Sequence, residues 1–319
     1  MSEHAVLDLF AGTGVGVACQ QLGVTEYGVE KMAAAQETRN LNGMGLAYDD
    51  VWDIEKAAAL SFDTLWASPP CQTFSVAGKG EGRKALTDVL EAIRAWRWTS
   101  VESLRTLGEE VGDERTALVL TPLAYVYRYR PTYIVFEQVP AVLPVWEACA
   151  GFMRDMGYAV WTGYLHAEQY DVPQTRKRAY LIARSDGKEA KPPMPAGSKV
   201  SMFDALGWGI SNRPSPTVTG HMTATRSPSG TQAIYLKAIS SGNFIFRPGA
   251  SRKNSTVAKN GIGSMYPPDS VNITISDGCK LQGYPDGFVI SGTKADQQLQ
   301  VGNAVPPPVA RAVLGELWT

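Results

Sequence analysis

The residue of this chain best suited to nucleophilic chemistry is a cysteine preceded by two prolines. Cys71 lies in Ser68-Pro-Pro-Cys-Gln-Thr-Phe-Ser75, directly after an apolar segment that favours a strand. The two prolines stiffen the chain and remove two N–H donors, which disfavours a helix or a central strand. A fixed, exposed thiol at a strand end can attack an electron-poor carbon as the thiolate. The alternative is a small buried apolar residue, the usual fate of a free cysteine.

A second candidate site begins at a glycine-rich turn, Asp8-Leu-Phe-Ala-Gly-Thr-Gly-Val-Gly16. Small residues there let backbone N–H groups approach a ligand at a helix N-terminus. A dinucleotide fingerprint would need glycine at position 17, which is Val17. Glu30 could accept hydrogen bonds from both ribose hydroxyls, and Asp53 and Ile54 could hold an adenine. These residues fit an adenosyl ligand without a pyrophosphate, such as S-adenosylmethionine; alternatively, the glycines are ordinary turn residues and Glu30 is a solvated strand end.

The other cysteines and the histidines are too scattered for a metal centre. Cysteines at 19, 71, 149 and 279 and histidines at 4, 166 and 221 form no Cys-x-x-Cys pair, so we expect neither a metal nor a disulfide framework. Cys19, Cys149 and Cys279 are expected in the core, and His166 in a turn. No stretch approaches the ~20 uncharged apolar residues of a membrane helix. The first apolar run lacks a basic leader, so we expect a cytoplasmic protein without membrane contact.

The elements that must position these residues alternate between strands and helices. Apolar runs predict strands at residues 5–10, 26–30, 63–67, 132–136 and 179–183, and helices at 15–22, closed by Gly23, and 31–41. This order indicates an α/β fold with a doubly wound, mostly parallel sheet, in which ligands bind at the carboxyl ends of the strands. The length of 319 residues predicts more than one ordinary domain.

Charge is distributed unevenly along the chain. Residues 185–275 carry ten basic and four acidic side chains, a net charge of +6, whereas the whole chain carries −1. This asymmetry suggests a smaller lobe that faces a polyanion. A solvated irregular lobe explains the charge equally well.

The motifs together resemble the DNA (cytosine-5)-methyltransferase family of bacterial or phage type. Pro-Cys-Gln at 70–72 resembles its nucleophile motif, and Asp8-Leu-Phe-Ala-Gly its cofactor loop, with Glu30 and Asp53-Ile54 as the ribose and adenine contacts. Further matches, in the same order as in the family, are Glu137-Gln-Val139, Tyr170-Asp-Val-Pro-Gln-Thr-Arg-Lys-Arg178, Leu281-Gln-Gly-Tyr-Pro-Asp286 and Gln300-Val-Gly-Asn-Ala-Val-Pro306. The resemblance spans nearly the whole chain.

The resemblance implies methyl transfer from S-adenosylmethionine to carbon 5 of a cytosine that has been flipped out of duplex DNA. Cys71 would attack carbon 6 of the base. Glu137 would present a proton to ring nitrogen 3, with burial raising its pKa. Arg178 would hold the carbonyl oxygen of the base, and Arg176 would position the thiol loop or the backbone.

The expected sites and domains follow from the same resemblance and from the shift in composition near residue 185. The expected cofactor-binding residues are Phe10, Ala11, Gly12, Gly14, Glu30, Asp53, Ile54, Pro70, Asn303 and Val305. The expected DNA contacts are Gln72, Ser75, Gln174, Arg213 and Arg247. Residues 1–184 would form the catalytic domain, completed by 296–319, and residues 185–295 a mostly irregular or β target-recognition domain and hinge. We expect the enzyme to act on duplex DNA as a monomer.

Four departures from the family pattern qualify this expectation. Gln138 stands in place of the usual asparagine. Lys31 follows the ribose carboxylate, where relatives often carry an apolar or aromatic residue, which leaves room for an acid-bearing cofactor. Ser276-Asp277 replaces a common Arg-Glu pair. The fourth is a longer link at about 82–115.

The link at 82–115 reads as a helical hairpin with apolar residues at helical spacing. Thr99-x-x-Glu102 resembles a capping box that starts its second helix. Either Arg94, Arg97 and Trp98 reach DNA or a partner subunit, or the hairpin packs on the body. The amphipathic pattern favours packing.

Two other functions compete with DNA methylation. One is cytosine methylation of transfer RNA, because a related branch shares most of the motifs. The other is a catalytically silent DNA-binding homologue, suggested by Gln138 alone and opposed by Cys71, Glu137 and Arg178.

Overall fold

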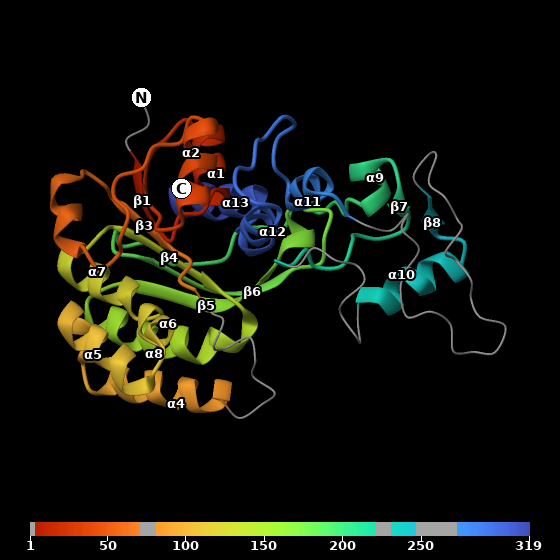
Figure 1. The fold of residues 1–319 in the computed structure, drawn as a ribbon. Coiled ribbons are helices and arrows are strands. Elements are labelled where there is room, and N and C mark those ends of the chain that lie inside the picture. The colour runs from red at the N-terminus through yellow and green to blue at the C-terminus, as the bar shows by residue number, and fades with distance from the viewer. Residues whose placement is uncertain (1–3, 71–80, 221–230, 247–272) are drawn as a thin grey trace. The chain divides into compact units, whose positions relative to one another are not determined.

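The computed structural model describes residues 4–70, 81–220, 231–246 and 273–319 (Figure 1). The chain divides into two compact units. The first contains Met1–Leu165, Lys177–Met194 and Ala310–Thr319, and the second contains His166–Arg176 and Pro195–Val309. The chain passes from one unit to the other after residues 165, 176, 194 and 309, whereas the expected domain boundaries lie near residues 184 and 296.

The first unit is built on one six-stranded sheet with the strand order β2-β1-β3-β4-β6-β5. The strands are β1 (Ala5–Leu9), β2 (Thr25–Val29), β3 (Thr64–Ala67), β4 (Tyr133–Gln138), β5 (Ala159–His166) and β6 (Lys177–Arg184). The neighbours from β2 to β4 pair in parallel, whereas β6 runs antiparallel to β4. The predicted doubly wound, mostly parallel sheet is confirmed.

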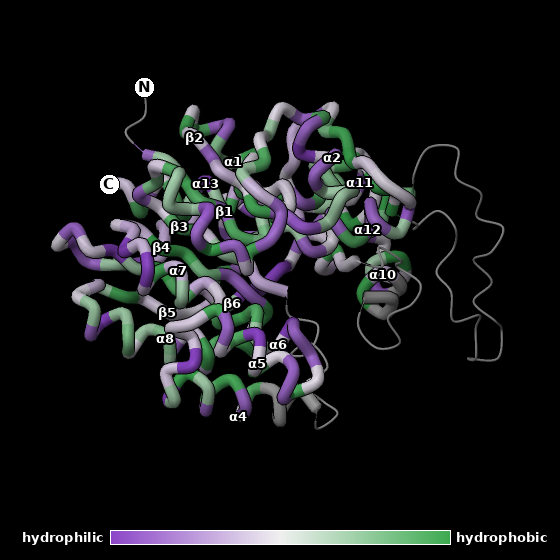
Figure 2. The backbone as a smooth tube through the Cα atoms, turned by 60° about the vertical axis from the view of Figure 1, so that its left-hand side comes forward, coloured by the Kyte–Doolittle hydropathy of each residue, from purple (hydrophilic) through white to green (hydrophobic). Residues whose placement is uncertain are grey.

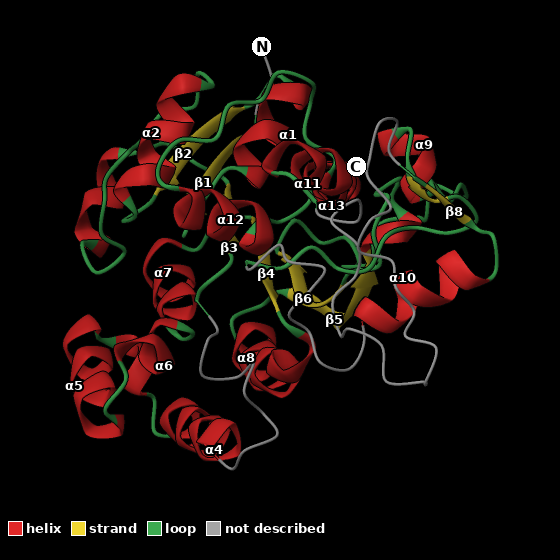
Figure 3. Cartoon of the chain, turned by 45° about the vertical axis from the view of Figure 1, so that its right-hand side comes forward, coloured by secondary structure: helices red, strands yellow, loops and turns green. Residues whose placement is uncertain are grey.

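The central strands are apolar because both faces of the sheet are covered. Residues 64–67 of β3 and 134–136 of β4 have no exposed surface. Helices α1 and α2 lie on one side of the sheet, and α4, α5, α6 and α8 lie on the other (Figures 1 and 3). Strands buried on both faces appear in sequence as unbroken apolar runs rather than as alternation, which is why they could be predicted.

The helices of the first unit agree with the prediction where the sequence pattern was strong. They are α1 (Gly14–Leu22), α2 (Ala33–Leu41), α4 (Glu81–Arg94), α5 (Val101–Val111), α6 (Glu114–Leu118), α7 (Thr121–Tyr129), α8 (Leu143–Asp155) and the last part of α13 (Pro307–Leu317). Short 3₁₀-helices are η1 (Ile54–Ala59), η2 (Arg97–Thr99) and η3 (Pro140–Val142), with η4 (Ala167–Gln169) in the second unit. Gly23 closes α1 in the left-handed conformation, with φ 67°, as predicted. Neither β5, α7 nor α8 was predicted.

The pairing registers bring the ends of four strands to one edge of the sheet. Leu9 of β1 pairs with Val29 of β2 and with Ala67 of β3, and Ala67 pairs with Phe136 of β4. Because these strands are parallel, the segments that follow them leave the sheet at this same edge. We call it the site edge.

The predicted helical link forms α4, η2, α5 and α6 and packs on the body of the first unit. Hydrophilic and hydrophobic residues alternate along α4 (Figure 2). Trp98 is 1% exposed and belongs to the core cluster that reaches the sheet. Arg97 donates to the Glu110 carboxylate. Trp98 is therefore too buried to reach DNA or a partner subunit, and the hairpin packs on the body as the alternative predicted. Arg94 is exposed at the end of α4, and a contact of Arg94 or Arg97 with DNA or a partner subunit stays a prediction.

The start of α5 lies one residue after the predicted position. Ser100, not Thr99, caps the helix and accepts from the N–H of Ser103. The Thr99 hydroxyl instead donates to the carbonyl oxygen of Trp96. Because serine and threonine both cap helices well, the sequence alone did not distinguish these two neighbours.

In its described residues, the second unit contains more helix than the sequence indicated. Its helices are α9 (Met202–Leu206), α10 (Thr231–Ser240), α11 (Ile275–Gln282) and α12 (Lys294–Asn303), and its strands are β7 (Gly209–Ile210) and β8 (Phe244–Ile245). The departure at Asp277 has a structural reason. Its carboxylate accepts from the backbone N–H of Thr274 at 2.9 Å and completes a capping box at α11.

Candidate active site

The turn after β1 has an unusual backbone and leads into the N-terminus of α1. Phe10 has a φ of 59°, a left-handed conformation that costs a residue with a side chain about 1–3 kcal/mol. Gly12 has a φ of 46°, and a Cβ atom built there meets no other atom within 4 Å. Because the Thr13 side chain does not cap α1, which begins at Gly14, the N–H groups of its first turn can donate to a ligand.

Not every glycine of this turn is there for a ligand. A Cβ atom at Gly16 would lie 2.5 Å from the sulfur of Met44. Packing against Met44 therefore explains the glycine at position 16 without a ligand.

Glu30 follows β2 at the site edge, and two backbone groups fix its carboxylate. Oε2 accepts from the N–H of Gly12 at 2.9 Å, and Oε1 accepts from the N–H of Met32 at 2.8 Å. An ionised carboxylate has about four acceptor positions. Two of them are used here, so each oxygen can also accept from a ribose hydroxyl.

Asp53 and Ile54 begin η1 in the same unit. Ile54 packs against the core cluster, and the Asp53 carboxylate pairs with Lys56 at 2.7 Å. Lys31 pairs with Asp50 at 3.2 Å. Since Lys31 has an acidic partner within the protein, an acid-bearing cofactor is not needed to explain it.

Gln138 at the end of β4 is joined to the segment that leads to the predicted nucleophile. Its Nε2 donates to the carbonyl oxygen of Pro69, and its Oε1 accepts from the N–H of Val139. Pro69 is buried and Pro70 half-buried. The longer side chain thus has partners for both its donor and its acceptor. Cys71, Gln72 and Ser75 lie outside the described residues.

Glu137 and Arg178 meet on one face of the sheet. Glu137 pairs with Tyr180 across the antiparallel β4–β6 ladder, and Arg178 is two residues from Tyr180, so its side chain lies on the same face. The Nε of Arg178 lies 3.3 Å from Oε1 of Glu137, whose side chain is 5% exposed. A buried carboxyl group and a guanidinium therefore lie side by side at the end of β4.

The three other cysteines are unsuited to nucleophilic attack. Cys19, Cys149 and Cys279 are buried, as predicted. Burial raises the pKa of Cys149 and that of Cys279 to about 12, and it raises the pKa of Cys19 as well. Since the thiolate is the nucleophile, these thiols are inert at neutral pH.

In the second unit, the predicted DNA contact Gln174 is an internal structural residue. It has no exposed surface. Its Nε2 donates to the carbonyl oxygen of Leu281 at 2.9 Å and to the side chain of Gln282 at 2.7 Å, and its Oε1 accepts from the N–H of Val218 at 2.9 Å. Because all these partners are protein groups, the predicted contact with DNA is not supported.

Arg176 is likewise buried in the second unit, with 3% exposure. Its Nη1 donates to the carbonyl oxygens of Val218, at 3.2 Å, and Gly302, at 3.0 Å. Of the two roles that the resemblance implied, these contacts correspond to positioning the backbone.

The remaining predicted residues have varied exposure. Ala11 is buried in the first unit, and its N–H donates to the carbonyl oxygen of Val29 at 3.0 Å. In the second unit Arg213 is exposed, Asn303 is exposed at the end of α12 and Val305 is buried. Arg247 lies outside the described residues. The ligand contacts of these residues stay predictions.

His166 ends β5 and begins η4, and its ring lies 3.7 Å from the Glu168 carboxylate. Among the described residues, no cluster of histidine, cysteine and acidic side chains could hold a metal ion. Nor is any described helix both long and apolar enough to cross a membrane.

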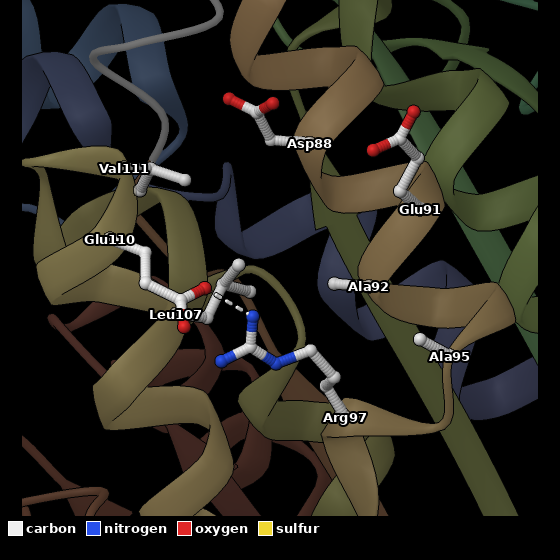
Figure 4. Close-up of a pocket in the computed structure, with 8 residues that line it drawn as sticks. All are labelled: Asp88, Glu91, Ala92, Ala95, Arg97, Leu107, Glu110 and Val111. Carbon is white, nitrogen blue, oxygen red and sulfur yellow. Dashed lines mark hydrogen bonds and ion pairs between the residues drawn. The ribbon is translucent and has the colours of Figure 1, made fainter.

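A surface pocket of about 400 Å³ lies between α4 and α5 (Figure 4). Its lining combines acidic side chains, small apolar ones and Arg97, which points toward Glu110 (Figure 4). None of its described lining residues belongs to the predicted site.

Sequence reasoning missed Arg39, a buried side chain that donates to the carbonyl oxygen of Gly12 at 3.0 Å. One signal was available. Gly28 lies within β2, and glycine inside a strand often marks a close approach by another group.

Comparison with known families identifies the chain. The family of C-5 cytosine-specific DNA methylases matches residues 4–95, 103–219 and 222–319. Within the predicted link, residues 96–102 fall outside the match.

Similar curated proteins and solved structures cover almost the whole chain. The type II methyltransferase M.AplI of Arthrospira platensis is 24% identical over 98% of this chain and 85% of its own length. M.HpaII of Haemophilus parainfluenzae is 26% identical over 97% and 88%. The fold resembles that of the Entamoeba histolytica methyltransferase EhMeth, with a TM-score of 0.65 and 14% identity over 100% of this chain and 98% of that one. The Dnmt2 methyltransferase of S. pombe gives a TM-score of 0.62 at 17% identity over 99% and 98%.

The methyl donor of this family is S-adenosylmethionine, and the residues present fit it. Gly12 borders open space, the first turn of α1 can donate hydrogen bonds, and the fixed Glu30 carboxylate has acceptor positions left for a ribose. The chain is therefore an enzyme that belongs to the C-5 cytosine-specific DNA methylase family.

Proposed function

We propose that the enzyme methylates carbon 5 of a cytosine flipped out of duplex DNA, through a covalent bond between Cys71 and carbon 6. The site edge is the observation that carries this proposal. Ala67, the last residue of β3 before Ser68-Pro-Pro-Cys71, pairs with Leu9 of β1 and with Phe136 of β4. The nucleophile segment thus starts between Glu137 and the turn at residues 10–13, which we call the cofactor turn.

In the proposed reaction the Cys71 thiolate forms a bond to carbon 6, which makes carbon 5 nucleophilic. Glu137 presents a proton to ring nitrogen 3 as negative charge develops there. Arg178, beside Glu137, holds the carbonyl oxygen of the base. Bound S-adenosylmethionine supplies the methyl group. Loss of the proton from carbon 5 and cleavage of the carbon–sulfur bond then restore the aromatic ring and the thiolate.

Gln138 is proposed to fix the start of the thiol loop. Its hydrogen bond to Pro69 ties the end of β4 to the residue two positions before Cys71. This anchoring speaks against the silent homologue, because the substitution that suggested it leaves the amide fully engaged.

The proposed substrate is DNA rather than RNA. The relatives M.AplI and M.HpaII are type II methyltransferases, and the family is one of DNA methylases. The net charge of +6 over residues 185–275 suits a polyanion. We assign target recognition to residues 185–295, with Arg213 and Arg247 as candidate contacts to bases or phosphates, and catalysis to residues 1–184 and 296–319.

Trapping with 5-fluorocytosine tests the proposal. Duplex DNA or structured RNA carrying this base is incubated with the enzyme and S-adenosylmethionine. Fluorine at carbon 5 prevents the last elimination, so the adduct persists and shifts in a denaturing gel. We expect a shift with DNA for the wild type and for the control C279A, and none for C71A. An adduct with RNA alone would establish the transfer RNA alternative, and no adduct with either would favour the silent homologue.

A further inference from the structure

The first unit buries a charged side chain in contact with the cofactor turn. Arg39 of α2 has no exposed surface. Its guanidinium lies against β2, where a Cβ atom at Gly28 would be 2.1 Å from Nη2. Glycine at position 28 therefore makes the space that the guanidinium fills.

The hydrogen bonds of Arg39 serve two purposes. Nη2 donates to both carboxylate oxygens of Glu26, at 2.8 and 2.6 Å, and the Glu26 side chain is 5% exposed. This pairing neutralises the buried charge. Nε and Nη2 also donate to the carbonyl oxygen of Gly45, at 3.1 and 2.6 Å, and Nη1 donates to that of Gly12, at 3.0 Å.

Gly12 is consequently held from both sides. Its carbonyl oxygen accepts from Arg39, and its N–H donates to Oε2 of Glu30 at 2.9 Å. A glycine with φ 46° has wide conformational freedom of its own. The two bonds restrict that freedom, and they link the buried guanidinium to the carboxylate that faces the ribose.

We propose that Arg39, neutralised by Glu26, is a positioning residue for the methyl donor. It acts through Gly12 and holds both the turn and the Glu30 carboxylate in the arrangement that receives the ribose. This inference rests on the ribose-binding role of Glu30 in the function proposed above. A lysine cannot replace Arg39, because a single ammonium lacks the fork that reaches Glu26 and Gly12 together.

Removal of the whole pair separates positioning from stability. R39M alone leaves the Glu26 charge buried without a partner and should lower Tm strongly. The double variant E26L/R39M replaces the pair by apolar side chains of similar size, which commonly restores stability. We expect a Tm near that of the wild type but a Kd for S-adenosylhomocysteine, measured by calorimetry, that is weaker by about 10-fold. Wild-type affinity in the double variant would show that the pair is only structural and would overturn the proposal.

The lysine variant gives a second readout if the double variant does not fold. In R39K the charge remains available to Glu26, so the protein should fold, but the bond to Gly12 is lost. We expect KM for S-adenosylmethionine to rise about 10-fold with kcat within about twofold, which is the signature of lost binding. A fall in kcat with KM unchanged would contradict a role in donor binding.

The matched control is R97M, which removes an arginine paired with Glu110 on the packed hairpin, away from the cofactor turn. It should leave the Kd for S-adenosylhomocysteine unchanged. Because calorimetry needs neither DNA nor Cys71, a failure of the trapping experiment would leave this test intact. The two proposals can therefore fail separately.

Discussion

Each of the two units buries an arginine that holds the backbone of a glycine, and the contacts that we compare are a carboxylate in one unit and carbonyl oxygens in the other. In the first unit, Arg39 meets the Glu26 carboxylate as well as the carbonyl oxygen of Gly12. In the second, Nη1 of Arg176 donates to two carbonyl oxygens, one of them that of Gly302. A carboxylate left behind in the interior costs more than a carbonyl dipole. The same residue type should therefore show different sensitivity in the two units.

The arginines themselves should give the largest effect. R39M leaves Glu26 buried and unpaired, at an expected cost of about 3–5 kcal/mol. R176M removes hydrogen bonds from two carbonyl groups, at about 1–3 kcal/mol. Urea unfolding of both variants measures the difference. Equal losses would break the comparison, because they would show that the carboxylate partner makes no difference.

Substitution of the neighbouring glycines should give the next largest losses of stability. Here the larger loss is expected in the second unit. A Cβ atom at Gly302 would lie 2.1 Å from the backbone nitrogen of Gly220, whereas at Gly28 it meets the end of the Arg39 side chain. Backbone yields less than a side chain, so G302A should cost about 3 kcal/mol and G28A about 1–2 kcal/mol. The sharper test is suppression. Adding G28A to E26L/R39M should cost less than adding it to the wild type, since the guanidinium is gone.

A pH dependence is expected for the first unit at Asp8, which is buried near the Arg39–Glu26 pair. Burial, and then the Glu26 carboxylate, raise the pKa of Asp8 well above its usual range, although Arg39 lowers it. The native state keeps this proton at pH values at which the unfolded chain has lost it, so stability falls as pH rises above about 4. D8N removes the effect. As pH rises from about 4 to the native pKa of Asp8, the free energy of unfolding of D8N should increase relative to that of the wild type. The increase can reach about 1.4 kcal/mol per pH unit.

Urea unfolding of D8N and the wild type at about pH 5, 6 and 7 measures this gain. A constant difference between the two proteins would show that Asp8 ionises in the native state as it does in the unfolded chain.

Exposed charge should give the smallest effect. Lys31 pairs with Asp50 at 3.2 Å, but its side chain is 72% exposed. Such pairs contribute about 0–1 kcal/mol. K31A should change stability by no more than this and leave the Kd for S-adenosylhomocysteine within about twofold. A large loss of affinity would indicate that Lys31 contacts the cofactor and would support an acid-bearing ligand.

The central fold was predictable because it depends on local patterns. Apolar runs revealed β1, β3 and β4, since strands covered on both faces need no alternation. Gly23 marked the end of α1. By contrast β5 was missed because its residues are mostly half-buried, so its hydrophobic signal is weak. The internal hydrogen bonds of Gln174 could not be predicted, because a motif shows that a residue is needed without showing whether its partner is DNA or the protein itself.

The sequence by itself determined the central strands, the first two helices, the family, and the candidate residues at the strand ends, because these are encoded by neighbouring residues. Tertiary structure decided which residues meet. Arg39 and Gly12 are 27 positions apart, and Gln138 and Pro69 are 69 apart. No periodicity links such pairs, since their contact depends on strand register and on the space that Gly28 leaves. The contacts that hold Gly12 and Pro69 are therefore visible only in the folded chain.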